Sequence, residues 1–176
     1  MPYKSYIYVK NIVEKKFNMP SQGLIAQFGV HPDCATLDRL ITLYGKDRVV
    51  GYDSNTKIQH ENVLHVDFPS QFPRGKLQYA FSDIDVGDFS THSFVRQKIL
   101  IWVSERTVKN GLIMVNSPMI TDNIWQDLGH DHMIKNGFKC HRFVQYINES
   151  WYQDTLYCTN FNPATTCIYE KIGVNN

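Results

Sequence analysis

The sequence predicts an α/β fold, a doubly wound three-layer sandwich whose mainly parallel sheet carries a late antiparallel hairpin. Short apolar runs alternate with segments of helical periodicity along most of the chain, a pattern typical of parallel strands joined by helices. Several apolar runs end in an acid or a glycine, where an open parallel sheet holds its ligand. Only a polar loop separates the last two runs, which predicts that these strands are antiparallel neighbours.

Size and composition restrict the classes of protein to which this chain can belong. The chain has 176 residues, of which 43% are hydrophobic and 20% are charged, which is ordinary for a single globular domain over residues 1–176. Its formal net charge of +1 gives no field that would favour nucleic acid or a membrane surface as partner. No apolar signal segment begins the chain and no run reaches the length of a bilayer span. A cytoplasmic protein is therefore expected, with its four cysteines as reduced thiols.

Seven strands are expected from the apolar runs and the turn residues that flank them. The first is a continuous apolar run, as in a strand that is buried on both faces. The expected strands cover residues 24–30, 48–53, 63–67, 77–84, 112–116, 138–145 and 165–172. His65 lies inside the third run and is expected to be a core histidine.

Three helices are expected between these strands. Residues 35–44 carry an apolar stripe at i, i+3, i+4 and i+7 spacing, and residues 91–108 and 122–135 show similar spacing. Asn110-Gly111, just after the second of these segments, is expected to be a helix C-terminus that leads into the next strand. Right-handed crossovers then place helices on both faces of the sheet.

The strand ends carry residues suited to a nucleotide-like ligand. Gly29 ends the first strand, and a glycine lets the backbone approach a ligand that a Cβ would block. Asp53 ends the second strand, and a carboxylate accepts hydrogen bonds from both hydroxyls of a ribose. Asp67, Asp85 and Asn116 follow the next three strands. The structural alternatives are a plain turn glycine, a helix cap and solvated turn acids.

Asp83, Asp85 and Asp88 form the densest acid cluster of the chain. In an extended segment Asp83 and Asp85 point to the same side, and carboxylate oxygens suit Mg²⁺ or a similar hard cation. Asp85 is the residue expected to orient or deprotonate an acceptor, and an exposed acidic loop is the alternative. His130 and His132 would hold a transition metal only in a frayed helix, because histidines two apart do not share a helix face.

Three sequence patches, in this order and spacing, resemble class I S-adenosylmethionine-dependent methyltransferases. Residues 27–36 (QFGVHPDCAT) are similar to a first motif E-F-G-V-x-x-G-x-S/T, and residues 50–55 (VGYDSN) are similar to a second motif V-x-G-F-D-S-F. Residues 84–91 (IDVGDFST) are similar to I-D-V-D-L-Y-x-x-T with one extra residue at Gly87. Within that family, the patches most resemble macrocin O-methyltransferase-like enzymes.

This resemblance implies a Rossmann-like methyltransferase fold that binds S-adenosyl-L-methionine and methylates an oxygen of a small hydroxylated acceptor. It implies that residues at the first three strand ends bind the cofactor. These residues are Phe28, Gly29, Val30, Asp53, Ser54 and Asp67. Asp85 keeps the catalytic role given above, and with Asp88 it is the expected site of a Mg²⁺ ion. The resemblance leaves the oligomeric state open, with a homodimer as one alternative.

The sequence departs from the family's pattern at three places. Gln27 stands where the first motif has an acid, no glycine occurs within residues 32–35, and the fifth strand ends in Asn116-Ser117 instead of a pair of acids. A catalytically inactive methyltransferase-like domain that binds a nucleotide-like ligand or a protein is therefore an alternative. A Rossmann-type oxidoreductase or sugar-nucleotide enzyme is a third, although the chain has no complete G-x-G-x-x-G phosphate turn.

Overall fold

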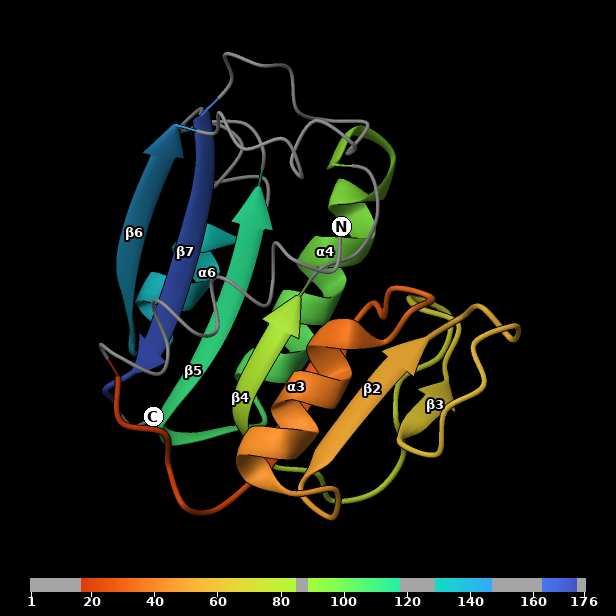
Figure 1. Ribbon diagram of the computed structural model, residues 1–176. Helices are drawn as coiled ribbons and strands as arrows, with labels where there is room; N and C mark the ends of the chain where they lie inside the picture. Colours follow the sequence, from red (N-terminus) through yellow and green to blue (C-terminus); the bar gives the residue numbers. More distant parts are fainter. Residues whose placement is uncertain (1–16, 85–88, 118–128, 147–162, 174–176) are drawn as a thin grey trace.

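The computed structural model describes residues 17–84, 89–117, 129–146 and 163–173 (Figure 1). Within these ranges the chain forms a seven-stranded mixed sheet in the order β3-β2-β1-β4-β5-β7-β6. The strands are β1 (Leu24–Phe28), β2 (Val49–Asp53), β3 (Val63–His65), β4 (Tyr79–Ile84), β5 (Thr107–Ser117), β6 (Phe138–Tyr146) and β7 (Pro163–Lys171). Strands β1 to β5 are parallel, whereas β7 runs antiparallel to both β5 and β6. The predicted parallel sheet with a late antiparallel hairpin is confirmed.

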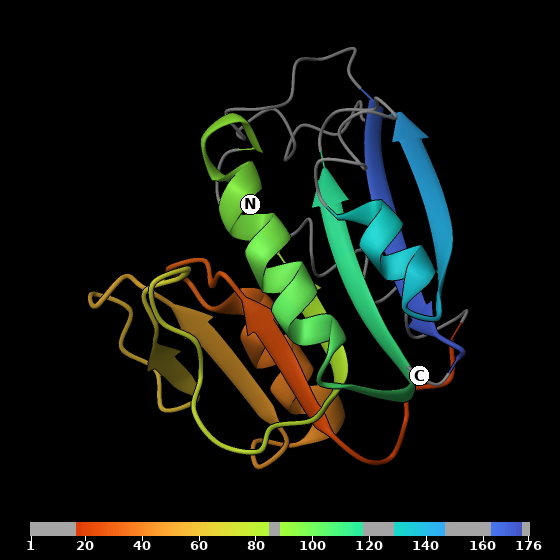
Figure 2. The ribbon, with the colours of Figure 1, turned by 180° about the vertical axis from the view of Figure 1, so that it is seen from behind.

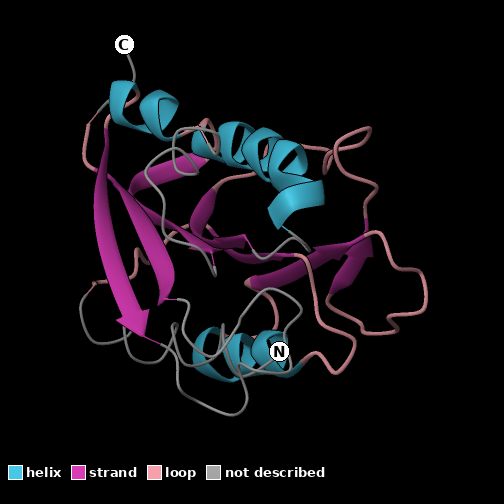
Figure 3. Cartoon of the chain, turned by 90° about the horizontal axis from the view of Figure 1, so that it is seen from above, coloured by secondary structure: helices cyan, strands magenta, loops and turns pink. Residues whose placement is uncertain are grey.

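The described helices cover both sides of the sheet, as a doubly wound sandwich requires (Figure 2). They are α3 (Ala35–Tyr44), α4 (Phe89–Ser104) and α6 (His130–Lys135). Figure 3, seen from above, shows α3 on one side of the sheet and both α4 and α6 on the other. None of these described helices is long and apolar enough to cross a bilayer. The three-layer architecture is therefore the one that the alternation of strands and helices predicts.

The face of the sheet toward α4 is packed with aromatic side chains. The ring of Phe28, which is fully buried, lies 5.0 Å from the ring of Tyr52 and 5.8 Å from that of Tyr79. The hydroxyls of the two tyrosines are hydrogen-bonded at 2.9 Å, and burial raises the pKa of both phenols. Trp102 of α4 contacts the rings of Phe28 and Tyr79 from the helix layer that covers this face. Buried aromatic groups of this size dominate the packing energy of a core.

The opposite face of the sheet packs against α3. Leu37 and Leu40 of this helix are fully buried and join Ile25 of β1 in a second apolar cluster. The helix ends where Gly45, with a φ of 93°, donates its N–H to Ile41 O at 2.8 Å. With a ψ of 144°, this backbone conformation is open to glycine and strained for residues with a Cβ. The bounds of α3 agree with the predicted helix at both ends.

The helix predicted over residues 91–108 and the strand predicted over residues 112–116 both have different boundaries in the structure. α4 ends at Ser104, and Arg106 N–H donates to Val103 O (3.0 Å) just beyond that end. β5 then begins at Thr107, so Asn110-Gly111 lies inside this strand, and the prediction of a helix C-terminus there is wrong. The register between β4 and β5 shifts at this point, as in a bulged strand.

Gly111 is needed in the bulge because neighbouring atoms come very close. A Cβ on Gly111 would lie 2.6 Å from Thr107 Cγ2 and 2.8 Å from Val108 O. Asn110 has a φ of 65°, which asparagine tolerates better than most residues. An Asn-Gly pair suits a helix end and a bulge equally well, which explains why the sequence pattern led to the wrong element.

Strand β3, at the edge of the sheet, is shorter than the sequence predicts. β3 covers only Val63–His65, so the predicted strand up to residue 67 is too long. The connections 54–62 and 66–78 are fully described and contain no helix. His65 is exposed and its Nε2 lies 3.0 Å from Ile58 O. The prediction of a core histidine is wrong, because this short edge strand is not covered around His65.

Candidate functional site

The strand order reverses between β1 and β4. From β1 the chain moves outward to β2 and β3, and it then returns to form β4 on the other side of β1. The arrowheads of the parallel strands point to one common edge (Figure 1). In open α/β sheets the ligand crevice lies outside the carboxyl ends of the strands, at such a reversal. The candidate site is therefore the edge formed by the ends of β1, β2 and β4.

A glycine turn ends β1 at this edge. Gly29 has a φ of 91° and donates its N–H to Tyr52 O at 2.8 Å. This left-handed conformation strains any residue with a Cβ. The turn extends the contact with β2 by one residue and then carries the chain away from the sheet toward α3. Gly29 therefore forms the strand-end turn, as its structural alternative has it, and its predicted contact with a ligand stays a prediction.

Asp53 connects three segments of this edge. Its Oδ2 accepts the Val30 N–H (2.8 Å), its Oδ1 accepts the Asn55 N–H (2.8 Å), and its backbone O accepts the Val66 N–H (3.0 Å). The residue is half-buried. Each carboxylate oxygen has two acceptor positions, so each oxygen retains one after these bonds. Asp53 can thus hold the β1 loop and still accept two hydroxyl groups of a ligand.

Cys34 adopts a left-handed backbone conformation in the loop where this chain lacks the second glycine of the first motif. Its φ is 56°, in the left-handed region, and it forms the N-cap of α3. Its N–H donates to His31 O (2.8 Å), and Ala35 N–H donates to Asp33 Oδ1 (3.0 Å). Burial first, and then Asp38 and the nearby Asp33, raise the pKa of the Cys34 thiol. The loop therefore closes without the glycine, although a cysteine pays a conformational penalty in this region.

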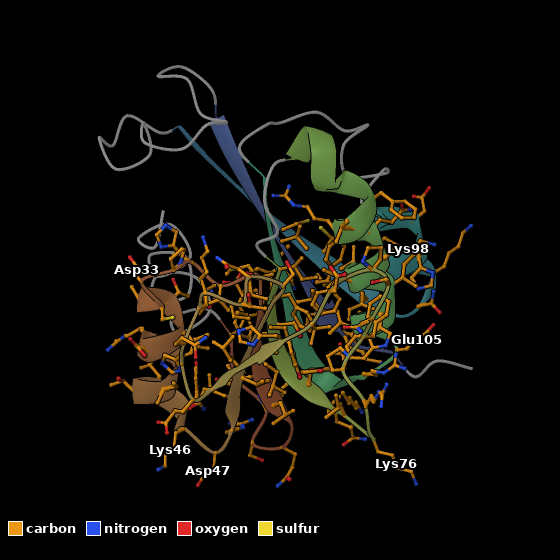
Figure 4. All side chains as sticks on the ribbon, turned by 90° about the vertical axis from the view of Figure 1, so that its right-hand side faces the viewer. Asp33, Lys46, Asp47, Lys76, Lys98 and Glu105 are labelled. Carbon is orange, nitrogen blue, oxygen red and sulfur yellow. The ribbon has the colours of Figure 1, made fainter. Side chains whose placement is uncertain are left out.

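The first turn of α3 lies at the same edge as these loops. In Figure 4, Asp33 is at the start of α3, and Lys46 and Asp47 are near the opposite edge of the sheet. The N-terminus of a helix carries a partial positive charge. The start of α3 therefore adds to the polar character of the candidate site.

Two buried polar side chains lie below this edge, on the face of the sheet toward α3. Gln27 of β1 is 3% exposed and Asp83 of β4 is fully buried. The two residues are register partners in adjacent parallel strands, so their side chains project to the same face. Among the described residues, no donor lies within hydrogen-bond distance of Gln27 Oε1. Sequence reasoning treated Gln27 only as a departure from a motif and missed this pair.

The predicted cofactor residues lie in different surroundings. Gly29, Val30 and Asp53 are joined by the hydrogen bonds above, and Ser54 is an exposed neighbour. The side chain of Phe28 points into the aromatic cluster of the α4 face. The side chain of Phe28 is therefore occupied in the core, so the predicted cofactor contact of this residue would have to come from its backbone.

Three further acids were predicted for the site. One of them, Asp67, lies in a described turn, and the other two lie outside the described part of the chain. Asp67 is exposed two residues beyond β3, with Ser70 Oγ 2.8 Å from its backbone O. Asp85 and Asp88, predicted for catalysis and for Mg²⁺, lie outside the described residues. Their roles stay predictions.

The described part of the chain contains no group of three or more His, Cys, Asp and Glu side chains that could hold a metal ion. His130 Nδ1 lies 2.9 Å from the Tyr169 hydroxyl, and His132 Nε2 lies 3.4 Å from Ser104 Oγ. These histidines therefore contact other parts of the fold and do not converge on a common point. Within the described part of the chain, these two histidines give no support to a transition-metal site at this helix.

Two clefts that described residues line lie away from this edge. One of about 590 Å³ lies beside β3 and is lined by residues that include Tyr52, His65 and Arg74. Another of about 720 Å³ lies at the amino ends of the strands, with Phe17 and Glu170 in its lining. Neither of these two clefts is lined by the glycine turn or by Asp53. Topology and side-chain chemistry therefore define the candidate site.

Comparison with known proteins gives structural matches only. No protein-family model matches the chain, and no curated protein matches its sequence. A methyltransferase from Pyrococcus furiosus is similar with a TM-score of 0.65 and 9% identity, over 98% of this chain and 83% of that one. A putative class I S-adenosylmethionine-dependent methyltransferase from Listeria monocytogenes has a TM-score of 0.61 and 13% identity, over 100% of this chain and 62% of that one.

A third neighbour was solved with its cofactor. Magnesium protoporphyrin IX methyltransferase from Synechocystis, with bound S-adenosylmethionine, has a TM-score of 0.59 and 12% identity, over 97% of this chain and 79% of that one. At these identities the likeness shows the fold alone. The chain has the Rossmann-like methyltransferase fold, and its structural neighbours are class I S-adenosylmethionine-dependent methyltransferases.

Proposed function

We propose that this chain binds S-adenosyl-L-methionine and transfers its methyl group to an oxygen of a small hydroxylated acceptor. The fold and the identity of the structural neighbours support this proposal. The observation that carries it is the position of Asp53, whose carboxylate holds the Gly29-Val30 turn and keeps free acceptor positions at the strand reversal. The closer resemblance to macrocin O-methyltransferase-like enzymes depends on the three sequence patches and belongs to the same proposal.

The residues present fit the adenosyl part of the donor. The remaining acceptor positions of Asp53 suit the two ribose hydroxyls, and the Gly29 backbone leaves room for close approach. Val30 and Ser54 would flank the ribose, and Asp67 would lie on the outer side. The donor, when bound, supplies a methyl group already activated on a sulfonium. The protein's task is to hold the acceptor in line with that group and to exclude water.

Activation of the acceptor is the proposed role of Asp85. A hydroxyl becomes a better nucleophile when a base removes its proton or when a metal polarises it. We propose Asp85 as the base or orienting group, with Asp88 as its partner if a Mg²⁺ ion takes part. Methyl transfer measured with Mg²⁺ and with a chelator separates the two routes, because a chelator abolishes only the metal-dependent one.

Calorimetry with S-adenosylmethionine and S-adenosylhomocysteine tests the proposal. We expect wild-type protein to bind both below about 1 mM. Asp53→Ala should weaken both roughly tenfold or more, because hydrogen bonds to a charged group are lost. Asp47→Ala is the matched control, since Asp47 is exposed at the opposite edge of the sheet, and it should bind like wild type. Absence of binding to folded wild-type protein at about 1 mM would refute the proposal.

A catalytically inactive domain of the same fold is the second candidate. Gln27 in place of an acid and the helix-free connections beside β3 favour it. Methyl transfer to a panel of small phenols, sugars and hydroxy acids distinguishes the two candidates. Transfer that is lost in Asp85→Asn supports the enzyme. Donor binding without transfer to any acceptor in the panel supports the binding domain.

A further inference from the structure

The cleft beside β3 has no part in the proposed function. Its volume is about 590 Å³, within the range of about 300–1,000 Å³ that is usual for small-molecule sites. We propose that this cleft binds a small aromatic carboxylate, with the aromatic body on the apolar lining and the carboxylate on Arg74. The inference goes beyond methyl transfer and does not depend on it.

The connection from β3 to β4 leaves room for this cleft because it contains no helix. In a doubly wound sandwich, helices normally join the parallel strands and cover the sheet, whereas the fully described connection 66–78 forms none. A right-handed connection from β3 back to β4 passes on the side of α4. In Figure 2, α4 crosses the middle of the sheet, and connecting loops lie beside β3. The cleft therefore lies where a helix of this connection would otherwise pack.

Most of the lining of the cleft is apolar. Leu64 of β3 is the register partner of Tyr52 of β2, so both side chains project to the side of α4. Tyr52 is buried, but Leu64 is 55% exposed, which is unusual for a large hydrophobic residue in the described part of the chain. The other apolar residues of the lining are Val66, Phe72, Pro73 and Leu77. A ligand that covers these side chains removes apolar surface from water, which favours binding.

Phe72 gives the cleft a fixed aromatic wall. Its ring is stacked on Trp102 of α4, with ring centroids 5.2 Å apart and an interplanar angle of 22°. It also meets the ring of Phe68 edge-on, at 5.4 Å. Because these contacts already hold the wall in place, a ligand has little ordering cost to overcome there. An aromatic ligand suits this wall, since offset and edge-to-face ring contacts add to the gain from apolar burial.

Arg74 determines the charge of the ligand. Among the described residues that line the cleft, Arg74 is the only arginine or lysine, and none is an aspartate or glutamate. None of the ion pairs formed among the described residues involves Arg74. A guanidinium binds a carboxylate through two parallel hydrogen bonds. One permanent cation without a nearby acid therefore favours a ligand with a single carboxylate.

Two probes of the same shape test the inference on the full chain by calorimetry. They are 2-naphthoate, which carries a carboxylate, and 2-naphthamide, its neutral counterpart. We expect wild-type protein to bind 2-naphthoate below about 1 mM and to bind 2-naphthamide roughly fivefold more weakly, because an exposed ion pair contributes little more than that.

Three variants assign the contacts of these probes. Arg74→Gln should weaken 2-naphthoate roughly fivefold and leave 2-naphthamide unchanged. Leu64→Asn should weaken both probes roughly fivefold, because it removes apolar contact and leaves the charge of the cleft as it is. Lys76→Ala is the matched control, since Lys76 is an exposed cation on the same loop but does not line the cleft (Figure 4). It should bind both probes like wild type.

Other outcomes overturn the inference and are distinct from failure of the proposed function. Wild-type protein that binds neither probe at about 1 mM, or that binds both equally, overturns it, and this comparison decides even where a variant does not fold. Unchanged binding of 2-naphthoate to Arg74→Gln also overturns it. Displacement of 2-naphthoate by S-adenosylhomocysteine would put the probe at the strand-end edge and overturn the inference alone. Expected binding of 2-naphthoate without any binding of S-adenosylhomocysteine would refute the proposed function alone.

Discussion

The two faces of β1 and β4 differ although consecutive residues build them. Toward α4, Phe28 lies in a closed aromatic cluster with Tyr52 and Tyr79. Toward α3, the preceding residue Gln27 and its register partner Asp83 are just as buried but polar. In a strand buried on both faces, apolar side chains are expected on each side. The α4 face also holds polar atoms, which are the paired hydroxyls of Tyr52 and Tyr79 and the buried Ser82. The α3 face differs because a carboxyl group and a carboxamide lie there in register on adjacent strands.

Phe28→Ala should have the largest effect and tests the stabilising face. Removal of this fully buried ring should lower the free energy of unfolding by about 3–5 kcal/mol. Urea unfolding measures this loss, and Phe28→Leu, which keeps most of the apolar volume, should lose clearly less. Folded Phe28→Leu should bind the donor like wild type, because the Phe28 side chain faces α4. A strong loss of donor affinity in Phe28→Leu would contradict the division between the two faces.

Asp53→Ala should have an intermediate effect on stability, since this residue joins the edge of the site to the fold. It removes the acceptors of the Val30 and Asn55 N–H groups. For a half-exposed position we expect a loss of about 2 kcal/mol. Asp67→Ala, at an exposed turn, should change the free energy of unfolding by less than about 0.5 kcal/mol. Equal losses in the two variants would mean that the Asp53 bonds do not stabilise the loop.

The tyrosine pair predicts loss of stability in alkali. Burial raises the pKa of Tyr52 and Tyr79 above that of an unfolded tyrosine. The unfolded chain therefore releases these protons first, and stability that is complete below about pH 10 falls as the pH rises further. The expected slope is about 1.4 kcal/mol per pH unit for each tyrosine. Urea unfolding at several alkaline pH values should show a smaller slope in Tyr79→Phe, and an unchanged slope would contradict this assignment.

Gln27→Leu should have a smaller effect on stability than the changes at Phe28 and Asp53, and the opposite sign. Exchange of a buried acceptor without a described donor for an apolar group should raise the free energy of unfolding by about 1 kcal/mol. Thermal unfolding of the variant and of wild-type protein measures this effect. A destabilised Gln27→Leu would indicate that this face is ordinary packing surface.

The regular elements were predictable because their periodicity is strong. α3 agrees with residues 35–44 because its apolar stripe meets the sheet and Gly45 ends it. The start of β5 was not predictable, because the bulge at Asn110-Gly111 depends on the close approach of Thr107 and Val108, which the sequence does not reveal. Likewise, nothing in the sequence around His65 indicates that β3 stops after three residues at an edge of the sheet.

From the sequence, the candidate site was predictable only for residues that can be recognised individually, by residue type and by position at a strand end. Gly29 and Asp53 could be named from the glycine turn and the strand-end acid, and the structure places them together. The neighbourhood of Gln27 and Asp83, 56 positions apart in the sequence, depends on the register of β1 against β4. Register of that kind follows from the whole sheet and cannot be obtained from either segment alone. The ligand contacts of Asp53 and the roles of Asp85 and Asp88 stay predictions.

The turn that leads into α3 also bears on the protein's response to oxidation. Cys34 lies at a helix N-terminus, a location that usually favours the reactive thiolate. Burial and the surrounding carboxylates act the other way and keep its sulfur protonated. Peroxides and alkylating reagents attack the thiolate, so they should react slowly with this sulfur. The loop that carries the glycine turn can therefore contain a cysteine without becoming a point of chemical damage.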